Sequence, residues 1–484
     1  MNLEQSFKNI DRKLWKNVDN ALDYMEQTSW IIFLKYIDDL EDEIKFKSEL
    51  KNKKYEKLFK KDFQWKNWAY KENARENLNG EDLIDFVQNK LFPYLSSFKN
   101  DKHDIGTLHY KIGEIFSEIT NKITDGYILR DILDISNELR FKTEDEKFQF
   151  TNLYESKLKQ MGNAGRNGGQ YYTPRPLIDS IVDIIDPKPG ETIIDPSAGS
   201  CGFLAKAYKN LINKKNISTK EVDLIKRKSI FGIENKGLAF ITGTMNLVLH
   251  GIDSPNLTKM NTLNTNTFNL NEKDRFDIIL ANPPFAGSET EQIQLNFPIK
   301  TSLTYLLFMQ YFMKILKKKG RAGIIIKNTF LSNKDKAHVA IRKELLSNFN
   351  LHTILDLPAN VFSVGVQTVA LFFEKGQSTK SIWYYQLNLD RNLGITNPLN
   401  EKDLREFLSL KDSRKDTKNS WIVNIDEIST KDFNLEAVNP NIEEEKIEDT
   451  KKVLEEINSY EEKNTGYEKE LKIILNENRT KKTN

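Results

Sequence analysis

The residues with the most specific chemistry are Asn282-Pro283-Pro284-Phe285, which follow an apolar run at Phe276–Leu280. Two consecutive prolines fix φ and remove two backbone donors, so this rim is rigid and its carbonyl acceptors are free. The Asn282 side-chain oxygen and the Pro283 carbonyl form a pair of acceptors for one amino group, and Phe285 offers a ring for stacking. Such acceptors can draw the delocalised amine of a base toward tetrahedral geometry and hold it in line with a methyl donor. The pattern therefore predicts methylation of an exocyclic amine.

A turn of small residues follows an earlier apolar run and opens a helix, at Asp195-Pro-Ser-Ala-Gly199-Ser200-Cys201-Gly202-Phe203. Small residues let a ligand approach the backbone, and the start of a helix supplies free N–H groups. No Gly-Lys-Ser/Thr follows, so the turn is not a P-loop. The acidic residue that a nicotinamide cofactor requires about 20 positions later is missing too. Glu234 instead ends the next apolar run, where it can accept both hydroxyls of a ribose.

A glycine-rich segment precedes both motifs, from Gly162 to Gly169, and leads into Gln170-Tyr-Tyr-Thr-Pro-Arg175. The glycines predict a mobile segment, so the Tyr-Tyr-Thr-Pro-Arg run can lie over a bound cofactor. An inter-domain linker is the alternative reading, and one segment can serve both purposes.

Proline divides the chain into the regions that must position these motifs. Of 13 prolines, only Pro93 lies before residue 174, and only Pro440 follows Pro398. Because proline is excluded from helix interiors, residues 1–145 are predicted to form an N-terminal helical domain and residues 436–484 a helical tail for subunit docking. A stripe typical of an amphipathic helix supports the first prediction; its members are Phe7, Ile10, Leu14, Val18, Leu22 and Met25.

Residues 146–435 alternate short apolar runs with helical stretches, which predicts an α/β fold with an open, mostly parallel sheet. Ligands bind such sheets at the carboxyl ends of the strands. The last two predicted strands are joined by a long loop without a clear helix, so that pair can be antiparallel. The predicted strands are Thr192–Ile194, Ile230–Ile233, Phe276–Leu280, Ala322–Ile326, Thr353–Leu355 and Thr368–Phe373. The predicted helices include Leu177–Ile185, Phe203–Leu211, Gly237–Leu249 and Thr304–Leu316.

Composition excludes several other classes of protein. The 484 residues carry 72 Lys and Arg against 70 Asp and Glu, so any contact with nucleic acid must come from local patches. One cysteine excludes a disulfide framework and a Cys-based zinc site, and it indicates the reducing cytoplasm. The five scattered histidines form no metal-binding pattern. No apolar run reaches the ~18 residues of a membrane span, and the polar N-terminus is not a signal peptide.

Taken together and in this order, the motifs resemble those of S-adenosylmethionine-dependent amino-methyltransferases of DNA. More narrowly, the chain resembles the modification (M) subunit of type I restriction–modification systems. The resemblance covers nearly the whole chain and also rests on Leu14-Trp15, on Ile32–Tyr36 and on the late segment Leu357–Thr368. It implies a Rossmann-like methyltransferase domain, with S-adenosylmethionine as cofactor and the N6 amino group of adenine as methyl acceptor.

The resemblance also implies a role for each matching position. Residues 170–175 would contact the methionine end of the cofactor, the small-residue turn would form the floor of its pocket, Glu234 would hold the ribose and Asn261 would lie beside the cofactor's adenine. The implied cofactor-binding residues are Gln170, Tyr171, Tyr172, Thr173, Pro174, Arg175, Asp195, Gly199, Ser200, Cys201, Gly202, Phe203, Glu234 and Asn261. The implied catalytic residues, which hold the target adenine, are Asn282, Pro283, Pro284 and Phe285.

Two positions depart from the family pattern. Cys201 stands in a turn where Gly-x-Gly-Gly is usual, and its Cβ is expected to require a negative φ. Its thiol is expected to be a small filler and not a nucleophile, because no histidine is near in sequence. Asn261 stands where Asp is common, so its bond to the cofactor's adenine is expected to be weaker.

The target amine lies inside a duplex, so the base must be flipped out, at a cost of a few kcal/mol. A net charge of +2 gives little surplus for binding a duplex tightly, and no segment is large enough for a separate target-reading domain. We therefore expect a specificity (S) subunit, docked on the helical ends, to choose the sequence. The resemblance also implies double-stranded DNA as substrate and a second M subunit in the complex, and it leaves a restriction (R) subunit open.

Other functions remain open from the residues alone. One is methylation of another amine: N4 of cytosine, a base in RNA, or a glutamine amide of a protein. The other is a DNA-bound scaffold with weak catalysis, which the departures at Cys201 and Asn261 make conceivable.

Overall fold

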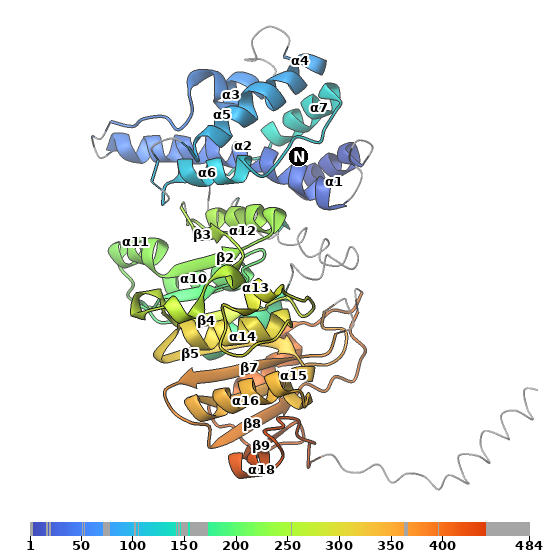
Figure 1. The fold of residues 1–484 in the computed structure, drawn as a ribbon. Coiled ribbons are helices and arrows are strands. Elements are labelled where there is room, and N and C mark those ends of the chain that lie inside the picture. Colours follow the sequence, from blue (N-terminus) through green and yellow to red (C-terminus); the bar gives the residue numbers. More distant parts are fainter. Residues whose placement is uncertain are drawn as a thin grey trace, which may run out of the picture. The chain divides into compact units, whose positions relative to one another are not determined.

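In the computed structural model, the apolar runs of the middle region pair into one mixed sheet, and helices lie between most of them (Figure 1). Among the described residues the sheet has nine strands, in the order β3-β2-β1-β4-β5-β7-β6-β8-β9. The strands are β1 (Ile193–Asp195), β2 (Ile230–Glu234), β3 (Asn256–Lys259), β4 (Phe276–Ala281), β5 (Leu316–Lys327), β6 (Phe349–Asp356), β7 (Thr368–Lys375), β8 (Ser381–Gln386) and β9 (Ser420–Asn424).

The structure describes most of the chain before residue 442. The described residues are 3–15, 18, 21–50, 52, 54–70, 78–100, 103–104, 106–141, 143, 146, 153–154, 173–252, 254–362, 366–394 and 396–441. By its internal contacts the chain divides into two units, residues 1–438 and 439–484. The expected helical tail therefore lies almost entirely outside the described residues.

The pairing of the strands confirms the mostly parallel sheet. Strands β1, β2, β3, β4 and β5 pair in parallel with their neighbours, whereas β7 runs antiparallel between β5 and β6. The antiparallel pairing of β6 with β7 is the one suggested by their long connection. Strands β3, β8 and β9 were not predicted, and they add one strand to one edge of the sheet and two to the other.

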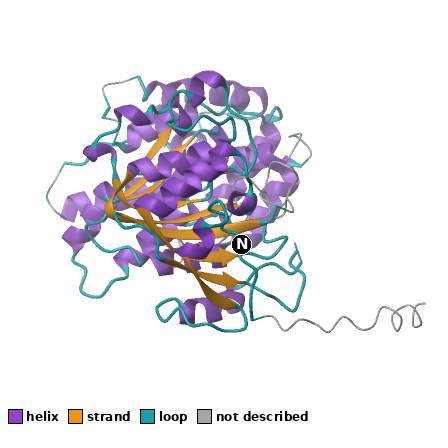
Figure 2. Cartoon of the chain, turned by 60° about the horizontal axis from the view of Figure 1, so that its bottom comes forward, coloured by secondary structure: helices purple, strands orange, loops and turns teal. Residues whose placement is uncertain are grey.

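Both faces of the sheet are buried, and Figure 2 shows purple helices on either side of the orange strands. Successive residues of one strand belong to different cores: Ile193 packs with α9 and α10, whereas Ile194 packs with α14 and α16. This alternation follows from the pleat, which points neighbouring side chains to opposite faces. The helices of this region are α9 (Arg175–Ile185), α10 (Gly202–Ile212), α11 (Thr219–Lys228), α12 (Gly237–Leu249), α13 (Glu291–Gln294), α14 (Thr304–Ile315), α15 (Thr329–Ser332), α16 (Lys336–Asn348), α17 (Arg405–Leu410) and α18 (Ile425–Ser429).

The N-terminal region is helical, as the scarcity of proline predicts. Its helices are α1 (Leu3–Leu14), α2 (Ala21–Leu50), α3 (Trp65–Trp68), α4 (Gly80–Asp85), α5 (Phe92–Ser97), α6 (Leu108–Phe116) and α7 (Gly126–Asn137). The apolar stripe from Phe7 to Met25 is divided between α1 and α2, and so is not one helix. Of the residues between α1 and α2, Trp15 and Val18 are described, and Val18 of the stripe belongs to neither helix.

Three contacts fasten the N-terminal helices to α12 and to the edge strand β3. Lys111 of α6 is buried, and its Nζ donates to the backbone oxygen of Leu257 in β3 at 2.6 Å and to Glu114 Oε2 at 2.7 Å. Glu118 forms an ion pair with Lys259 at the end of β3. The hydroxyl of Tyr36 in α2 donates to the carbonyl of Val248 in α12 at 3.3 Å. The N-terminal helices therefore cover this edge of the sheet.

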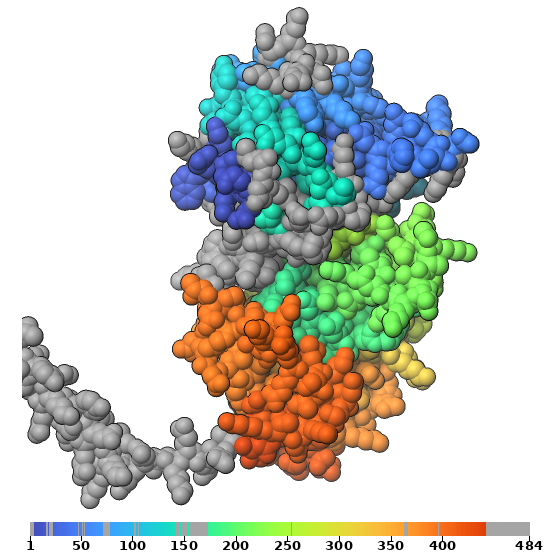
Figure 3. Space-filling model, turned by 180° about the vertical axis from the view of Figure 1, so that it is seen from behind, coloured from blue at the N-terminus to red at the C-terminus, as the bar shows by residue number. Residues whose placement is uncertain are grey.

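The late part of the same unit returns to the start of the α/β region. In Figure 3 the orange residues near α17 adjoin the green residues around α9 and α10. Lys411 Nζ donates to the backbone oxygen of Asp183 in α9 at 2.9 Å, and Phe407 of α17 is fully buried. This packing closes the sheet face that carries α9.

Candidate active site at the carboxyl ends of the central strands

The carboxyl ends of β1, β2 and β4 meet at one edge of the sheet, because these strands are parallel neighbours. Strands β2 and β3 follow β1 toward one edge of the sheet, whereas β4 and β5 lie toward the other edge, so the strand order reverses between β1 and β4. Open α/β sheets bind their ligands at such a change of direction. Asp195 ends β1, Glu234 ends β2 and Asn282 follows β4, so the structure brings together the three motifs that are far apart in sequence.

The small-residue turn after β1 is held by the two carboxylates. Asp195 Oδ1 accepts from the backbone N–H of Ser197 at 3.0 Å, and Glu234 Oε2 accepts from the N–H of Gly199 at 2.8 Å. Glu234 Oε1 accepts from the N–H of Lys236 at 2.7 Å. Sequence reasoning assigned Glu234 only to a ribose, and the structure shows that it also anchors the turn.

Burial raises the pKa of Asp195 to about 8, although the Ser197 N–H lowers it in part and the Glu234 carboxylate raises it further. Burial also raises the pKa of Glu234, against the backbone N–H groups of Lys236 and Gly199. Among the described residues, the charge of Lys236 partly opposes this rise at Glu234, whereas no lysine or arginine does so at Asp195. A positively charged ligand would therefore stabilise the ionised form of this pair.

Cys201 does not have the negative φ expected for it, because its φ is 60°, in the left-handed region. The conformation costs about 1–2 kcal/mol for a residue with a Cβ. Its side chain is fully buried, and its Sγ would lie 2.7 Å from a Cβ added to Gly243 of α12. The thiol therefore fills the space beside Gly243. Burial raises the pKa of this thiol well above its usual value, which fits the expected filler and not a nucleophile.

Asn246 of α12 is a residue of this site that sequence reasoning missed. It is fully buried, and its Nδ2 donates to the backbone oxygen of Ser200 in the turn at 2.8 Å. The available signal was a side-chain amide in the otherwise apolar stretch Met245–Leu249. The Nδ2 of Asn246 has a partner, whereas its Oδ1 is buried and accepts no hydrogen bond from the described residues, which costs free energy.

Asn261 follows β3, but its side-chain oxygen is already engaged. Oδ1 accepts from the backbone N–H of Leu263 at 3.0 Å and so caps the short helix η4 (Thr262–Asn264). Thr262 Oγ1 donates to the backbone oxygen of Pro196 at 2.5 Å, which ties this turn to the one after β1. Asn261 thus lies next to the site, with one lone pair of Oδ1 already committed.

The N-terminus of α10 lies against the start of α9. Phe203 is buried, and a Cβ added to Gly202 would lie 2.6 Å from a guanidinium nitrogen of Arg175. The absence of a side chain at Gly202 therefore makes room for Arg175. Of the segment expected over the cofactor, Thr173, Pro174 and Arg175 are described, whereas Gln170, Tyr171 and Tyr172 lie outside the described residues.

The rim after β4 is in contact with that segment. Asn282 is half-buried, and its Nδ2 donates to Thr173 Oγ1 at 2.9 Å. Its Oδ1 is buried and accepts no hydrogen bond from the described residues. A buried acceptor without a donor costs free energy. An amino group brought to this position would supply the missing donor.

The remaining residues of the rim form a wall beside Asn282. Pro283 is buried, while Pro284 and Phe285 are partly exposed. The ring of Phe285 meets the buried ring of Phe362 edge to face, with centroids 5.4 Å apart. Phe362 belongs to the late segment to which no role was assigned from sequence, and it lies between β6 and β7.

Two expected absences can be examined in the described residues. No three His, Cys, Asp or Glu side chains there come together in a way that could hold a metal ion. None of the helices described has the length and apolarity needed to cross a bilayer.

Comparison with known proteins matches nearly the whole chain. A model of the N-6 DNA methylase family matches residues 145–450, and a model of the HsdM N-terminal domain matches residues 3–135. The methylase subunit of the type I restriction enzyme EcoEI of Escherichia coli is 34% identical over 453 residues, 90% of this chain and 89% of that protein.

Two solved structures share the fold over almost their full length. A modification subunit from Vibrio vulnificus YJ016 has a TM-score of 0.82 at 32% identity and covers 91% of this chain and 98% of its own. A chain from work on complex assembly and conformational transition of the type I R-M system has a TM-score of 0.80 at 29% identity and covers 98% of both chains.

Proposed function

Since the chain belongs to the N-6 DNA methylase family, as a methylase subunit of the type I restriction–modification kind, we propose that it methylates adenine on the Asn282–Phe285 rim with S-adenosylmethionine bound over β1 and β2. The enzyme class, an adenine-specific DNA methyltransferase, follows from the family. The proposal adds the residues that carry the reaction, the cofactor and the partners.

The donor set at the ends of β1 and β2 suits this cofactor. Asp195 and Glu234 are two buried carboxylates with raised pKa values, and S-adenosylmethionine carries a positive charge on sulfur. Each oxygen of Glu234 accepts one backbone N–H and keeps lone pairs for ribose hydroxyls. Gly199 to Gly202 would line the floor of the pocket, and Asn261 would lie beside the cofactor's adenine. When bound, the cofactor supplies an activated methyl group.

The single observation that carries the catalytic assignment is the buried Asn282 Oδ1 without a donor. In the proposed complex this oxygen and the Pro283 carbonyl accept from the N6 amino group of a flipped adenine. Phe285 stacks on the base, and Phe362 supports the ring of Phe285 from its edge. The bond to Thr173 fixes the Asn282 side chain, so the acceptor is oriented before the base arrives.

The proposed partners are those expected for a methylase subunit of this family. We propose double-stranded DNA as substrate, a specificity subunit that selects the sequence, and a second methylase subunit in the complex, acting in the cytoplasm. A net charge of +2 supports dependence on a partner for tight duplex binding. Residues 1–145 would form the helical domain, 146–435 the catalytic domain and 436–484 a tail that docks on another subunit.

The experiment is methyl transfer to duplex DNA by the chain in complex with its specificity subunit, followed by digestion and separation of the nucleosides. We expect N6-methyladenine at one sequence, and poor methylation by the chain alone. N4-methylcytosine, or methylation of protein or RNA in place of DNA, would contradict the target. Sequence-specific methylation by the isolated chain would contradict the need for a specificity subunit.

A further inference from the structure

A second polar pocket opens on the same edge of the sheet as the proposed catalytic rim. It lies at the carboxyl ends of β6 and β8 and has a volume of about 230 Å³. Strands β6 and β8 pair in parallel, and β6 is antiparallel to β7, which is antiparallel to β5. The ends of β6 and β8 therefore point the same way as the ends of β1, β2 and β4. Three strand spacings separate β4 from β6 in the sheet, which is roughly 14 Å.

One loop belongs to both places. Leu357 to Asn360 form part of the pocket wall, and the same loop continues to Phe362, whose ring meets Phe285 of the rim. The far end of the loop is held beside β5, because Gln367 lines the pocket and its backbone oxygen accepts from the N–H of Asn328, which follows β5. A group bound in the pocket would thus contact the loop that supports the rim.

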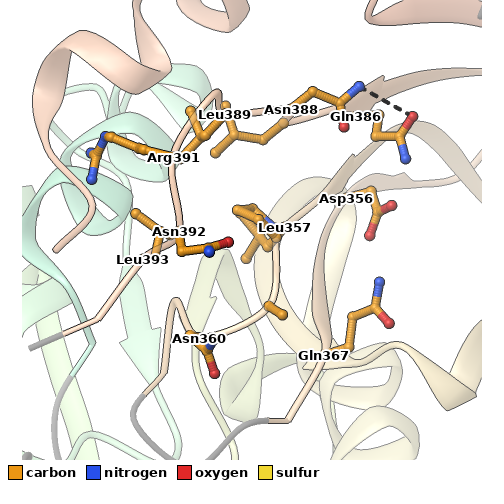
Figure 4. A pocket seen from close by; sticks show the side chains of 13 residues that line it. Asp356, Leu357, Asn360, Gln367, Gln386, Asn388, Leu389, Arg391, Asn392 and Leu393 are labelled. Atoms are coloured by element: carbon orange, nitrogen blue, oxygen red, sulfur yellow. Dashed lines mark hydrogen bonds between the residues drawn. The ribbon is translucent and has the colours of Figure 1, made fainter. Parts of the chain in front are cut away.

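The chemistry of the lining favours a group that donates hydrogen bonds. Asp356 lies between Gln367 and Gln386 (Figure 4), and its Oδ1 is buried and accepts no hydrogen bond from the described residues. Burial, together with the Glu436 carboxylate, raises the pKa of Asp356 to about 6, against the backbone N–H of Leu357, which lowers it. Asn360, Asn388 and the two glutamines add side-chain amides, and Asn388 Nδ2 already donates to Gln386 Oε1 at 3.4 Å (Figure 4).

A phosphate or another anion does not suit this pocket. Among the described residues that line it, the one cationic residue is Arg391, which points away from the pocket (Figure 4) and donates to Asp403 Oδ2 at 2.6 Å and to Asn397 Oδ1 at 2.6 Å. Leucine side chains complete the lining with flat apolar surface, Leu357 and Leu389 among them. The volume is below the roughly 300–1,000 Å³ of pockets for drug-sized ligands, so it suits a single small ring system.

We propose that this pocket binds a second base of the DNA substrate, one that carries an amino group, such as cytosine or guanine, near the target adenine. Recognition combines apolar contact with the faces of the base, amide contacts with its edge, and donation from its amino group to Asp356. Carboxylates read cytosine through its N4 amino group in the same way. The proposal rests on the proposed function, because it assumes that DNA lies along this edge of the sheet.

The test is a scan of duplexes that each lack one base at a position around the target adenine. Binding to the complex of this chain with its specificity subunit is measured by fluorescence anisotropy, without methyl transfer. The wild-type protein is compared with Asp356→Asn, which replaces an acceptor oxygen by an NH2 group in nearly the same volume. Asp390→Asn is the matched control, because Asp390 is exposed, lies two residues from Asn388 and does not line the pocket.

Positions read by the specificity subunit should show the same loss in every variant. Besides these and the target, we expect one position at which removal of the base weakens binding about tenfold in the wild-type protein and in Asp390→Asn. In Asp356→Asn that loss should disappear. The general gain in affinity from one fewer negative charge should be similar in both variants and on every duplex. Asn388→Ala, at an exposed pocket residue, should reduce the same loss and keeps the test valid if Asp356→Asn folds poorly.

Equal losses in all proteins at every sensitive position would overturn the proposal. Binding of free cytidine or guanosine to the wild-type protein but not to Asp356→Asn, without a sensitive position in the scan, would overturn the assignment to DNA. Methyl transfer to the intact duplex is measured separately, so failure of the proposed function can be told apart from failure of the pocket.

Discussion

Replacement of Asn282 by Ala removes one acceptor and leaves the cofactor pocket intact. Asn282 bonds to Thr173 and has no hydrogen bond to Asp195 or Glu234, the two carboxylates at the ends of β1 and β2. We therefore expect S-adenosylmethionine to bind Asn282→Ala with nearly the wild-type affinity, while methyl transfer becomes slow.

The size of the effect follows from what the side chain does in the transition state. The amino group gains positive charge as the methyl group arrives, so its bond to a buried oxygen strengthens during the reaction. Loss of one such oriented group costs about 3 kcal/mol, roughly a hundredfold in kcat. Thr173→Val removes the partner that orients Asn282, and loss of one hydrogen bond of about 1 kcal/mol predicts roughly a fivefold decrease. Thr173 is also an expected cofactor contact, so this rate is measured at saturating S-adenosylmethionine.

Single-turnover methyl transfer in the complex with the specificity subunit measures these rates, and calorimetry with S-adenosylmethionine measures cofactor affinity. Asn213→Ala is the control, because Asn213 is exposed and follows the far end of α10. A rate for Asn282→Ala within threefold of that control would refute the catalytic role of the rim. A loss of cofactor affinity as large as the loss of rate would also refute it, because the residue would then act on the pocket.

Three further predictions concern the carboxylate pair and the turn. Glu234→Gln leaves one of two backbone N–H groups without an acceptor, so thermal unfolding should show a loss of about 1–3 kcal/mol in stability. Calorimetry should show a lower affinity for the cofactor. Wild-type values of both quantities would exclude the anchoring role. Because burial raises the pKa of Asp195 to about 8, the unliganded carboxyl is largely protonated at pH 7, and a bound cation lowers that pKa. Cofactor binding should therefore release a proton below pH 8 and none well above it, which calorimetry in buffers of different ionisation enthalpy can measure; an uptake at pH 7 would contradict this sign. Cys201 should resist a thiol reagent in the folded protein and react on unfolding, because it is fully buried with a raised pKa; rapid labelling of the native protein would show that the turn opens.

The sequence located the strands of the sheet centre, because each of them contains a short apolar run. It missed the first half of β5, where Lys317, Lys318 and Lys319 interrupt the apolar pattern. β3 has only one buried residue, Leu257, so no apolar run marked it. β9 is likewise an edge strand with an exposed face. The aromatic stretch Trp383-Tyr384-Tyr385 of β8 did carry a strand signal, and it could have been recognised from residue type.

The positions of the site residues could also be expected, since the carboxyl ends of parallel strands share one edge. The hydrogen bonds that these residues form could not be predicted from the sequence. The bond from Asn246 to Ser200 and the bond from Gly199 to Glu234 join segments that are more than 30 residues apart, at angles that only the packed sheet defines. The left-handed Cys201 depends in the same way on the space beside Gly243. Residue type gave the chemistry of the turn, and tertiary packing gave its geometry.

The cover that Lys111 and its neighbouring helices provide for β3 has a practical consequence for anyone who truncates this protein. An edge strand with unpaired backbone N–H and C=O groups can pair with strands of other molecules. A fragment of residues 146–435 would lose the ammonium group that now occupies the Leu257 carbonyl. Such a fragment would be expected to self-associate through this margin, so preparations for crystallography or screening should retain the first 145 residues.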